Sequence, residues 1–432
     1  MKKLYLSISM LLVSFVFIGC NAATSLSTAP TSLTTEIETI TSETTTSNIT
    51  TQTTISNQIN KIEGTEMNNL EYVRWLGRTF YDETEELKYF YFTASGFEVA
   101  FYGTELKAIF KASNHDELNK QAYLVVLLDQ EEDPTKGVTI ILDQEEKEYT
   151  LAKGLEYGLH HIKVLKRSEA SDSVVALRQV STDGYFTEVS GEKTFKIQFI
   201  GDSTSVGYGN LGSLGEPKTT ANSDGLRAYA YLTGYLLDAE ISIFSASGWG
   251  VSRGFNTNGI ISETENIPNA FDYYAIDNTN KVYAQPGNWN HNNFVPDVIV
   301  VNLGVNDFNS AGYDIMNSLD RVDLEYRYWL DYTAFLVKLN NLYPDALIIV
   351  AFRFTNVPSG LVETTLEVIN EANRLIGETK IYAFEVEPAG TLGNDYGCDY
   401  HSNVGTNKNI AQSLAEYINS LTGREIKRTM ID

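Results

Sequence analysis

The chain has 432 residues, of which 43% are hydrophobic, enough for roughly two to three domains with sizeable cores. Asp and Glu total 56 against 32 Lys and Arg, and the net charge of −24 disfavours binding to nucleic acid or to anionic lipid. With two Cys in the chain, the sequence predicts neither a disulfide framework nor a Cys-based zinc site.

Residues 1–20 have the pattern of an export signal. Two lysines precede an apolar run over residues 4–18, which is short for a membrane span. The run ends in a sequence that resembles the bacterial lipobox, in which a small residue precedes an acylated cysteine, here Cys20. We expect a lipoprotein that is exported and held by its lipid on the outer face of the bacterial cell membrane. An ordinary signal peptide with an incidental cysteine is the alternative.

Residues 21–63 are mostly Thr and Ser as far as about residue 60. Such a segment buries too little apolar surface to offset the entropy lost on ordering. We expect a disordered tether that gives the folded part reach and carries no chemistry.

Residues 64–190 have the pattern of an all-β domain. Short runs with strand character follow one another, with turn residues between them, at 97–101, 106–110, 123–128, 138–142, 158–165 and 173–180. This spacing predicts a β-sandwich of the jelly-roll type.

Residues 191–432 alternate between buried strands and helices. Continuous apolar runs occur at 195–200, 241–244, 298–303, 347–352 and 381–386, and helical patterns at 224–238, 323–342 and 405–422. Continuous apolar runs are typical of strands covered on both faces. The alternation predicts a parallel sheet between two helical layers, an α/β/α domain.

Polar, glycine-containing clusters follow the strands of this domain. They lie at residues 201–203, 247–250 and 304–307, and a fourth cluster, at 397–401, precedes the last helix. Ligands of open parallel sheets bind beyond the carboxyl ends of the strands. We therefore expect these four clusters to meet in one site.

The residue types in these clusters are suited to acyl transfer. Ser203 is the candidate nucleophile, His401 the base that takes its proton, and Asp399 the acid that orients the imidazole. The oxyanion of the intermediate needs hydrogen-bond donors, which the backbone N–H groups of Ser203 and Gly248 and the side-chain amide of Asn306 can supply.

The four clusters resemble the conserved blocks of the SGNH (GDSL-type) hydrolases, in order and spacing, over residues 194–425. The whole layout is similar to carbohydrate esterase family 2, whose members place a β-sandwich before the SGNH domain. Segments 75–78 and 92–96 resemble that sandwich. The resemblance implies a serine esterase that removes O-acetyl groups from oligo- or polysaccharides through an acetyl-enzyme.

One position departs from the general SGNH pattern. Most SGNH hydrolases have the acid three residues before the histidine, where this chain has Cys398, whereas Asp399 lies two residues before His401. In some family 2 esterases a backbone carbonyl next to the histidine orients it, which in this chain would be that of Tyr400. Either Asp399 or this carbonyl is therefore expected to hold His401.

Substrate-binding positions are predicted from residues around the motifs. We assign Asp202, Trp249, Trp289 and Tyr400 to this role, since aromatic faces stack on sugar rings. The long segment 252–296, which contains Trp289, is expected to shape the site of the leaving sugar.

Other features of the sequence are given structural interpretations. Cys398 is expected to be a buried, unreactive thiol, with a role as nucleophile as the alternative. Residues 207–212 match GxGxxG but do not open a helix directly after a strand, and we interpret them as a loop beside the nucleophile. No histidine lies in a metal-binding pattern, and we expect a monomer that uses neither metal nor cofactor.

The sequence is also compatible with two rival functions. The sandwich could bind carbohydrate in a surface lipoprotein whose SGNH domain is inactive, or the same SGNH chemistry could serve a lipase or thioesterase.

Overall fold

The computed structural model describes residues 60–432 apart from 256–260, 262–264, 276–288, 311, 353–357, 359 and 387–394. The predicted export signal, with Cys20, and the predicted tether up to residue 59 lie outside the described residues. Among the described helices, none combines the length and the apolar character that crossing a membrane requires.

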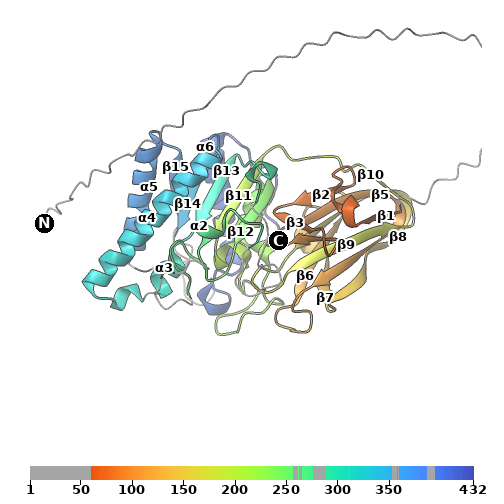
Figure 1. The fold of residues 1–432 in the computed structure, drawn as a ribbon, viewed down its shortest axis with the longest axis horizontal. Coiled ribbons are helices and arrows are strands. Elements are labelled where there is room, and N and C mark those ends of the chain that lie inside the picture. The colour runs from red at the N-terminus through yellow and green to blue at the C-terminus, as the bar shows by residue number, and fades with distance from the viewer. Residues whose placement is uncertain are drawn as a thin grey trace, which may run out of the picture. The chain divides into compact units, whose positions relative to one another are not determined.

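An antiparallel sheet comes first in the described chain (Figure 1, orange to yellow). Its strands are β1 (Lys61–Glu63), β2 (Val73–Leu76), β3 (Thr79–Asp82), β4 (Leu87–Phe90), β5 (Gly96–Ala112), β6 (Ala122–Leu128), β7 (Val138–Leu142), β8 (Glu146–Lys166), β9 (Val175–Thr182) and β10 (Tyr185–Thr187). β1 pairs with β9, so residues 61–63, predicted to end the tether, belong to the sheet.

The two longest strands make this sheet curl on itself. The prediction of uniformly short strands is wrong here, because β5 has 17 residues and β8 has 21. The glycine-containing segment 103–104, interpreted from the sequence as a break between strands, is an irregularity inside β5, where the pairing with β8 shifts register. The first half of β5 also pairs with β2 and β10, and its second half with β9. The change of partner along one strand lets the sheet enclose its own apolar core, which contains Phe97, Phe101 and Phe110.

A parallel sheet follows, with strands β11 (Lys196–Gly201), β12 (Glu240–Ser245), β13 (Val298–Asn302), β14 (Leu347–Phe352) and β15 (Ile381–Glu385). Their order is β12-β11-β13-β14-β15. In this order the chain leaves β11 to one side and later returns on the other, so the switch point lies between β11 and β13. The carboxyl ends of these two strands are where a ligand is expected.

The helices between these strands are α1 (Tyr229–Leu236), α2 (Ile267–Ala270), α3 (Val305–Ser310), α4 (Ser318–Leu342), α5 (Leu361–Ile376) and α6 (Val404–Thr422). α4 and α5 share one core with one face of the sheet, and α1 and α6 share a second core with the other face. The predicted fold class is confirmed. α5 was not predicted from the sequence, although it buries Leu361, Val368 and Ile369 on one face.

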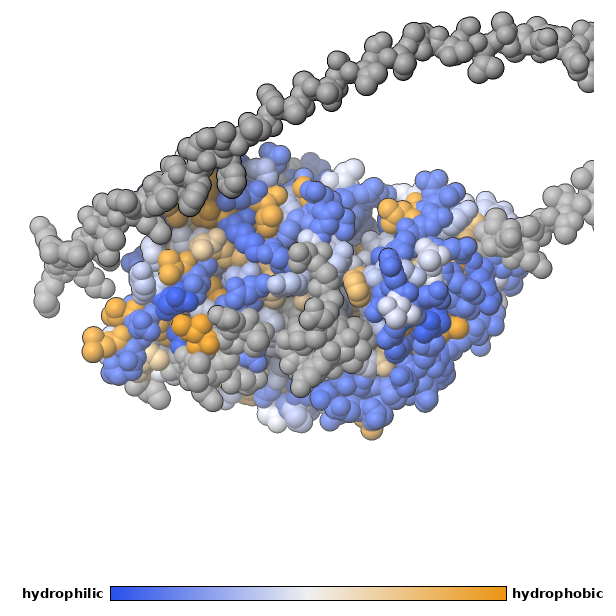
Figure 2. All heavy atoms as spheres, in the orientation of Figure 1, coloured by the Kyte–Doolittle hydropathy of each residue, from blue (hydrophilic) through white to orange (hydrophobic). Residues whose placement is uncertain are grey.

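The outer face of α4 exposes apolar side chains at helical spacing, namely Leu319, Val322, Tyr326 and Leu330. Figure 2 shows apolar atoms at the surface over this part of α4, within a described surface that is mostly hydrophilic.

The antiparallel sheet contacts the parallel sheet through apolar side chains and one buried cation. The Phe92 ring lies 4.8 Å from that of Phe244 in β12. Arg78 is 1% exposed, and its guanidinium lies 4.1 Å from the centre of the Phe244 ring and donates to the carbonyl of Phe271 at 2.6 Å. Burial lowers the pKa of Arg78 to about 9. The carbonyl groups of Phe271 and Tyr273 and the aromatic faces around Arg78 compensate for only part of its lost hydration, because its Nε and Nη2 have no hydrogen-bond partner among the described residues.

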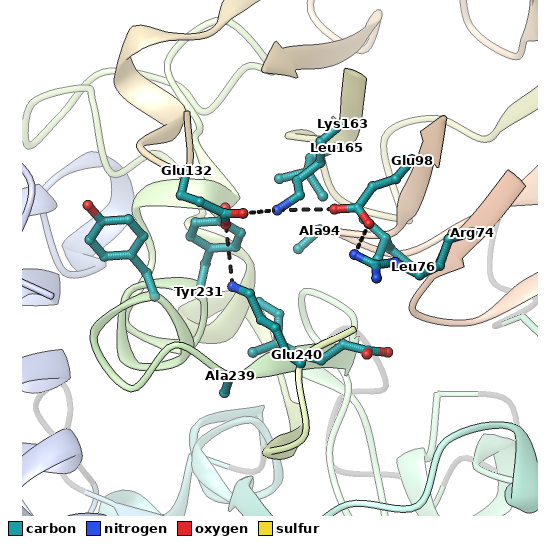
Figure 3. Close-up of a pocket in the computed structure, with 13 residues that line it drawn as sticks. Arg74, Leu76, Ala94, Glu98, Glu132, Lys163, Leu165, Tyr231, Ala239 and Glu240 are labelled. Atoms are coloured by element: carbon teal, nitrogen blue, oxygen red, sulfur yellow. Dashed lines mark hydrogen bonds and ion pairs between the residues drawn. The ribbon is translucent and has the colours of Figure 1, made fainter. Parts of the chain in front are cut away.

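A chain of ion pairs forms a second contact between the two sheets (Figure 3). Lys163 of β8 lies 3.2 Å from Glu98 of β5 and 2.6 Å from Glu132, and Glu132 lies 3.3 Å from Lys193. These side chains line a small cavity of about 50 Å³ that also touches Glu240, the first residue of β12. The cavity is therefore at the amino end of the parallel sheet, opposite the edge where a ligand is expected.

Candidate active site

Ser203 begins a short 3-10 helix, η4 (Ser203–Val206), directly after β11. Asp202 caps this turn, since its carboxylate accepts from the N–H of Thr204 at 3.0 Å. Gly201 is required before the turn, because a Cβ there would lie 2.1 Å from the hydroxyl oxygen of Ser205. The tight turn places the Ser203 hydroxyl at the carboxyl end of β11.

His401 lies against this hydroxyl, although 198 residues separate the two in the chain. Its Nε2 is 2.7 Å from Ser203 Oγ, and its Nδ1 is 3.2 Å from the backbone carbonyl of Asp399. A carbonyl only accepts, so this contact assigns the proton of a neutral imidazole to Nδ1. Nε2 is then left with a lone pair aimed at the serine hydroxyl. Burial lowers the pKa of His401, which favours this neutral form.

The group that orients His401 differs from both sequence expectations. The carboxylate of Asp399 accepts from the phenol of Tyr208 at 3.0 Å, and it is the carbonyl of Asp399, rather than that of Tyr400, that contacts the imidazole. The backbone explains the correction, because Asp399 and Tyr400 both have positive φ, 48° and 62°. This left-handed pair turns the Asp399 carbonyl toward His401 and its side chain toward Tyr208.

The predicted oxyanion donors follow the carboxyl ends of β11, β12 and β13, at the edge of the sheet that carries Ser203. Gly248, after β12, has φ 83°, a conformation that favours glycine. Among the described residues, no protein group accepts from the N–H of Ser203 or of Gly248. Asn306, in α3 after β13, donates through its amide to the carbonyl of Trp249 at 2.7 Å and to Asp202 at 3.2 Å. The roles of these three groups in catalysis remain predictions.

Two buried carboxylic acids, Asp202 and Asp307, hold backbone segments of the site by accepting from their N–H groups. Burial raises the pKa of Asp202 to about 7. Burial likewise raises the pKa of Asp307 to about 6. Asp307 accepts from three consecutive backbone N–H groups, those of Val251, Ser252 and Arg253, at 2.8–3.1 Å. It thereby fixes the segment that follows Gly248.

The residues assigned to substrate binding differ in exposure. Tyr400 is 58% exposed and lies next to His401 in the chain, whereas Asp202, Trp249 and Trp289 are at most 7% exposed. The Trp289 ring packs against Tyr274 at 5.5 Å, and Trp249 belongs to the apolar core under α4. The role of all four in binding stays a prediction, and Tyr400 presents the most open surface of the four. Part of the segment predicted to shape the sugar site, residues 256–260, 262–264 and 276–288, lies outside the described residues.

The sequence places Tyr208 in a loop beside the nucleophile and among the aromatic residues that could line the sugar site, but it does not predict that this ring stacks on His401, with centroids 4.2 Å apart. The GxGxxG-like run around Tyr208 carries no signal for this contact. The glycines of that run are explained by packing, since a Cβ on Gly209 would lie 2.4 Å from the Cβ of Cys398. Cys398 is fully buried, and burial raises the pKa of its thiol, which suits a packing role.

The described residues contain no group of three or more His, Cys, Asp or Glu side chains placed to hold a metal ion. The contacts at this site bring together Ser203, His401 and the hydrogen-bond donors that follow the neighbouring strands. A serine that shares its proton with a neutral histidine, beside two unused N–H groups, is suited to attack on an ester carbonyl.

Comparison with known proteins shows that this chain is similar to carbohydrate esterases. The family model described as "Carbohydrate esterase 2 N-terminal" matches residues 75–187. The Cellulase/esterase CelE of Acetivibrio thermocellus is 26% identical over 77% of this chain, which spans 37% of that longer protein. An acetylxylan esterase / glucomannan deacetylase of Cellvibrio japonicus is 25% identical over 64% of this chain and 70% of its own length.

A solved structure of a family two carbohydrate esterase from Clostridium thermocellum, in complex with cellohexaose, has the same fold. Its TM-score is 0.68 at 24% identity, over 81% of this chain and 99% of that one. The relationship and the fold expected from the sequence are both confirmed.

Proposed function

We propose that the chain is a serine esterase of the SGNH type, related to carbohydrate esterase family 2, that removes O-acetyl groups from carbohydrates. The observation that carries the proposal is the 2.7 Å contact between His401 Nε2 and Ser203 Oγ, at the switch point of the parallel sheet. Relatives named as esterases of acetylated polysaccharides support the substrate class.

In the proposed reaction Ser203 Oγ attacks the acetyl carbonyl while His401 Nε2 takes the hydroxyl proton. The oxyanion that forms accepts from the N–H groups of Ser203 and Gly248 and from the Asn306 amide, which would exchange its present acceptors for the oxyanion. Protonated His401 then gives its proton to the departing sugar oxygen. Water, deprotonated by the same imidazole, releases acetate and restores Ser203.

The carbohydrate is proposed to lie over the exposed ring of Tyr400, beside the acetyl site. An aromatic ring next to the nucleophile provides a flat apolar face for a sugar ring while leaving its hydroxyl groups in water. The acyl site is proposed to be small, so that it favours acetyl over longer acyl groups.

We also propose that Cys20 carries a lipid, so that the enzyme is exported, held on the outer face of the bacterial membrane and active as a monomer. The lysines, apolar run and cysteine of residues 1–20 support this proposal. Metabolic labelling with a radioactive fatty acid tests it, with Cys20→Ala as control. Label retained by the variant, or absent from the wild-type protein, would refute the lipid anchor.

The esterase proposal is tested by acetate release from a panel of acetylated polysaccharides. The wild-type chain is expected to release acetate, and Ser203→Ala to lose at least about 10³-fold in rate while keeping its thermal unfolding temperature. A folded wild-type chain that releases no acetate but is retarded in glycan affinity gels would instead support the carbohydrate-binding alternative.

A further inference from the structure

Glu169 is a buried carboxylate of the antiparallel-sheet region that reaches the candidate active site. It lies between β8 and β9 and is 2% exposed. Its Oε2 accepts from the backbone N–H of Ser247 at 3.1 Å, across 78 residues of sequence. Ser247 directly precedes Gly248, whose N–H is a proposed oxyanion donor.

The charge of Glu169 is retained inside the protein because Lys218 pairs with it. Lys218 Nζ lies 2.9 Å from Glu169 Oε1 and also pairs with Asp172. Burial alone would raise the pKa of Glu169, but Lys218 and the hydrogen bonds that the carboxylate accepts outweigh burial and lower it. An ionised, buried acceptor holds a backbone N–H more firmly than a neutral one.

The same cluster also touches the other half of the site. Lys218 Nζ lies 5.4 Å from the centre of the Tyr208 ring, and that ring stacks on His401. Glu169 thus contacts the turn that contains Gly248. Lys218 lies over the Tyr208 ring, which stacks on His401.

We infer that Glu169 is a positioning residue: by holding the Ser247 N–H it fixes the turn that aims the Gly248 N–H at the oxyanion. The inference rests on the proposed esterase function and adds to it that the antiparallel-sheet region completes the active site. Glu169 itself contacts no reacting atom. Its removal leaves the Ser247 N–H without its acceptor and lets the turn move, and a displacement of about 1 Å costs up to about 10²-fold in rate.

The chain offers a matched control in Glu98. This residue is also a buried carboxylate of the antiparallel sheet, 1% exposed, and is also paired with a lysine, Lys163. Glu98 lines the cavity at the amino end of β12 (Figure 3), whereas Ser203 follows the carboxyl end of β11. Loss of either charge disturbs a buried ion pair, but only Glu169 contacts the proposed oxyanion turn.

The test compares Glu169→Ala, Glu169→Gln and Glu98→Gln in the full chain, using 4-nitrophenyl acetate and thermal unfolding. Glu169→Ala is expected to lower kcat and kcat/KM together by about 10- to 100-fold, with KM within about twofold, as for an interaction made in the transition state. Glu169→Gln keeps an oxygen acceptor for the Ser247 N–H and should recover part of the loss. Glu98→Gln should lower the unfolding temperature and leave kcat within about twofold.

The inference is overturned if the Glu169 variants keep kcat within about twofold of wild type. It is also overturned if Glu169→Gln and Glu98→Gln lose kcat equally for equal losses in unfolding temperature. If Glu169→Ala does not fold, Glu169→Gln decides by the same criteria. An inactive wild-type enzyme would instead refute the esterase proposal itself, so the two failures are distinguishable.

Discussion

Replacing Asp399 by Asn separates the two ways in which this residue can orient His401. Asparagine is nearly isosteric and tolerates the left-handed backbone at this position, φ 48°, so the substitution removes the charge without straining the turn. The backbone carbonyl that contacts Nδ1 is unchanged. What is lost is the carboxylate that accepts from the phenol of Tyr208 at 3.0 Å.

The magnitude follows from which contact is lost. If the Asp399 carboxylate oriented the imidazole as in a full triad, its replacement would lower kcat by about 10⁴-fold. Among the described residues this carboxylate makes one hydrogen bond, an exposed one with Tyr208, for which about 1 kcal/mol, or about fivefold, is expected. We therefore predict that Asp399→Asn keeps kcat within about tenfold of wild type.

The assay is kcat for 4-nitrophenyl acetate, with Tyr208→Phe as the matched control. Phenylalanine keeps the stacking on His401 and removes the same hydrogen bond from its other side. The two single losses should be similar, and the double variant should lose little more than either one. A loss of 10³-fold or more in Asp399→Asn, with Tyr208→Phe near wild type, would refute the assignment of the carbonyl.

Three further predictions follow from pKa shifts and packing. Because burial lowers the pKa of His401, kcat/KM should fall only as the pH drops below about 6.5, and a midpoint at or above 7 would contradict this. Asp307→Ala leaves three backbone N–H groups without their acceptor and should lower the free energy of unfolding by about 2–5 kcal/mol in urea titrations, whereas a change under 1 kcal/mol would count against its anchoring role. Gly209→Ala places a Cβ 2.4 Å from that of Cys398 and should lower the free energy of unfolding by about 1–3 kcal/mol, measured by thermal unfolding. An unchanged unfolding temperature would show that the backbone around residue 209 can move away from Cys398 at no cost.

The sequence was sufficient for the parts of the site that depend on strand ends. Continuous apolar runs predicted β11, β13 and β14. The polar clusters that follow β11 and β13 placed Ser203 and Asn306 at one edge of the sheet. Parallel topology alone then brings these positions together. The structure also places His401 against Ser203, as its motif implied.

The parts that the sequence did not predict depend on backbone angles and on contacts between distant segments. The sequence around Asp399 does not show that two consecutive positive φ angles turn its carbonyl, instead of its carboxylate, toward His401. Glu169 follows a strand of the other sheet, where a carboxylate is ordinary, and its contact with Ser247 exists only once the two sheets pack. The length of β5 was likewise not predicted, because the strand continues through Gly103, and a glycine inside a strand pattern usually indicates a break or a bulge.

The role of Ser203 is tested most directly by locating the acetyl group on the enzyme. The full chain is mixed with 4-nitrophenyl acetate, quenched in acid during turnover, digested and mapped by mass spectrometry. We expect an acetyl group on Ser203, absent from Ser203→Ala and from His401→Ala, where the attacking hydroxyl or its base is missing. Acetylation of Cys398 instead, or acetate release that persists in Ser203→Ala, would contradict the central claim that Ser203 is the nucleophile.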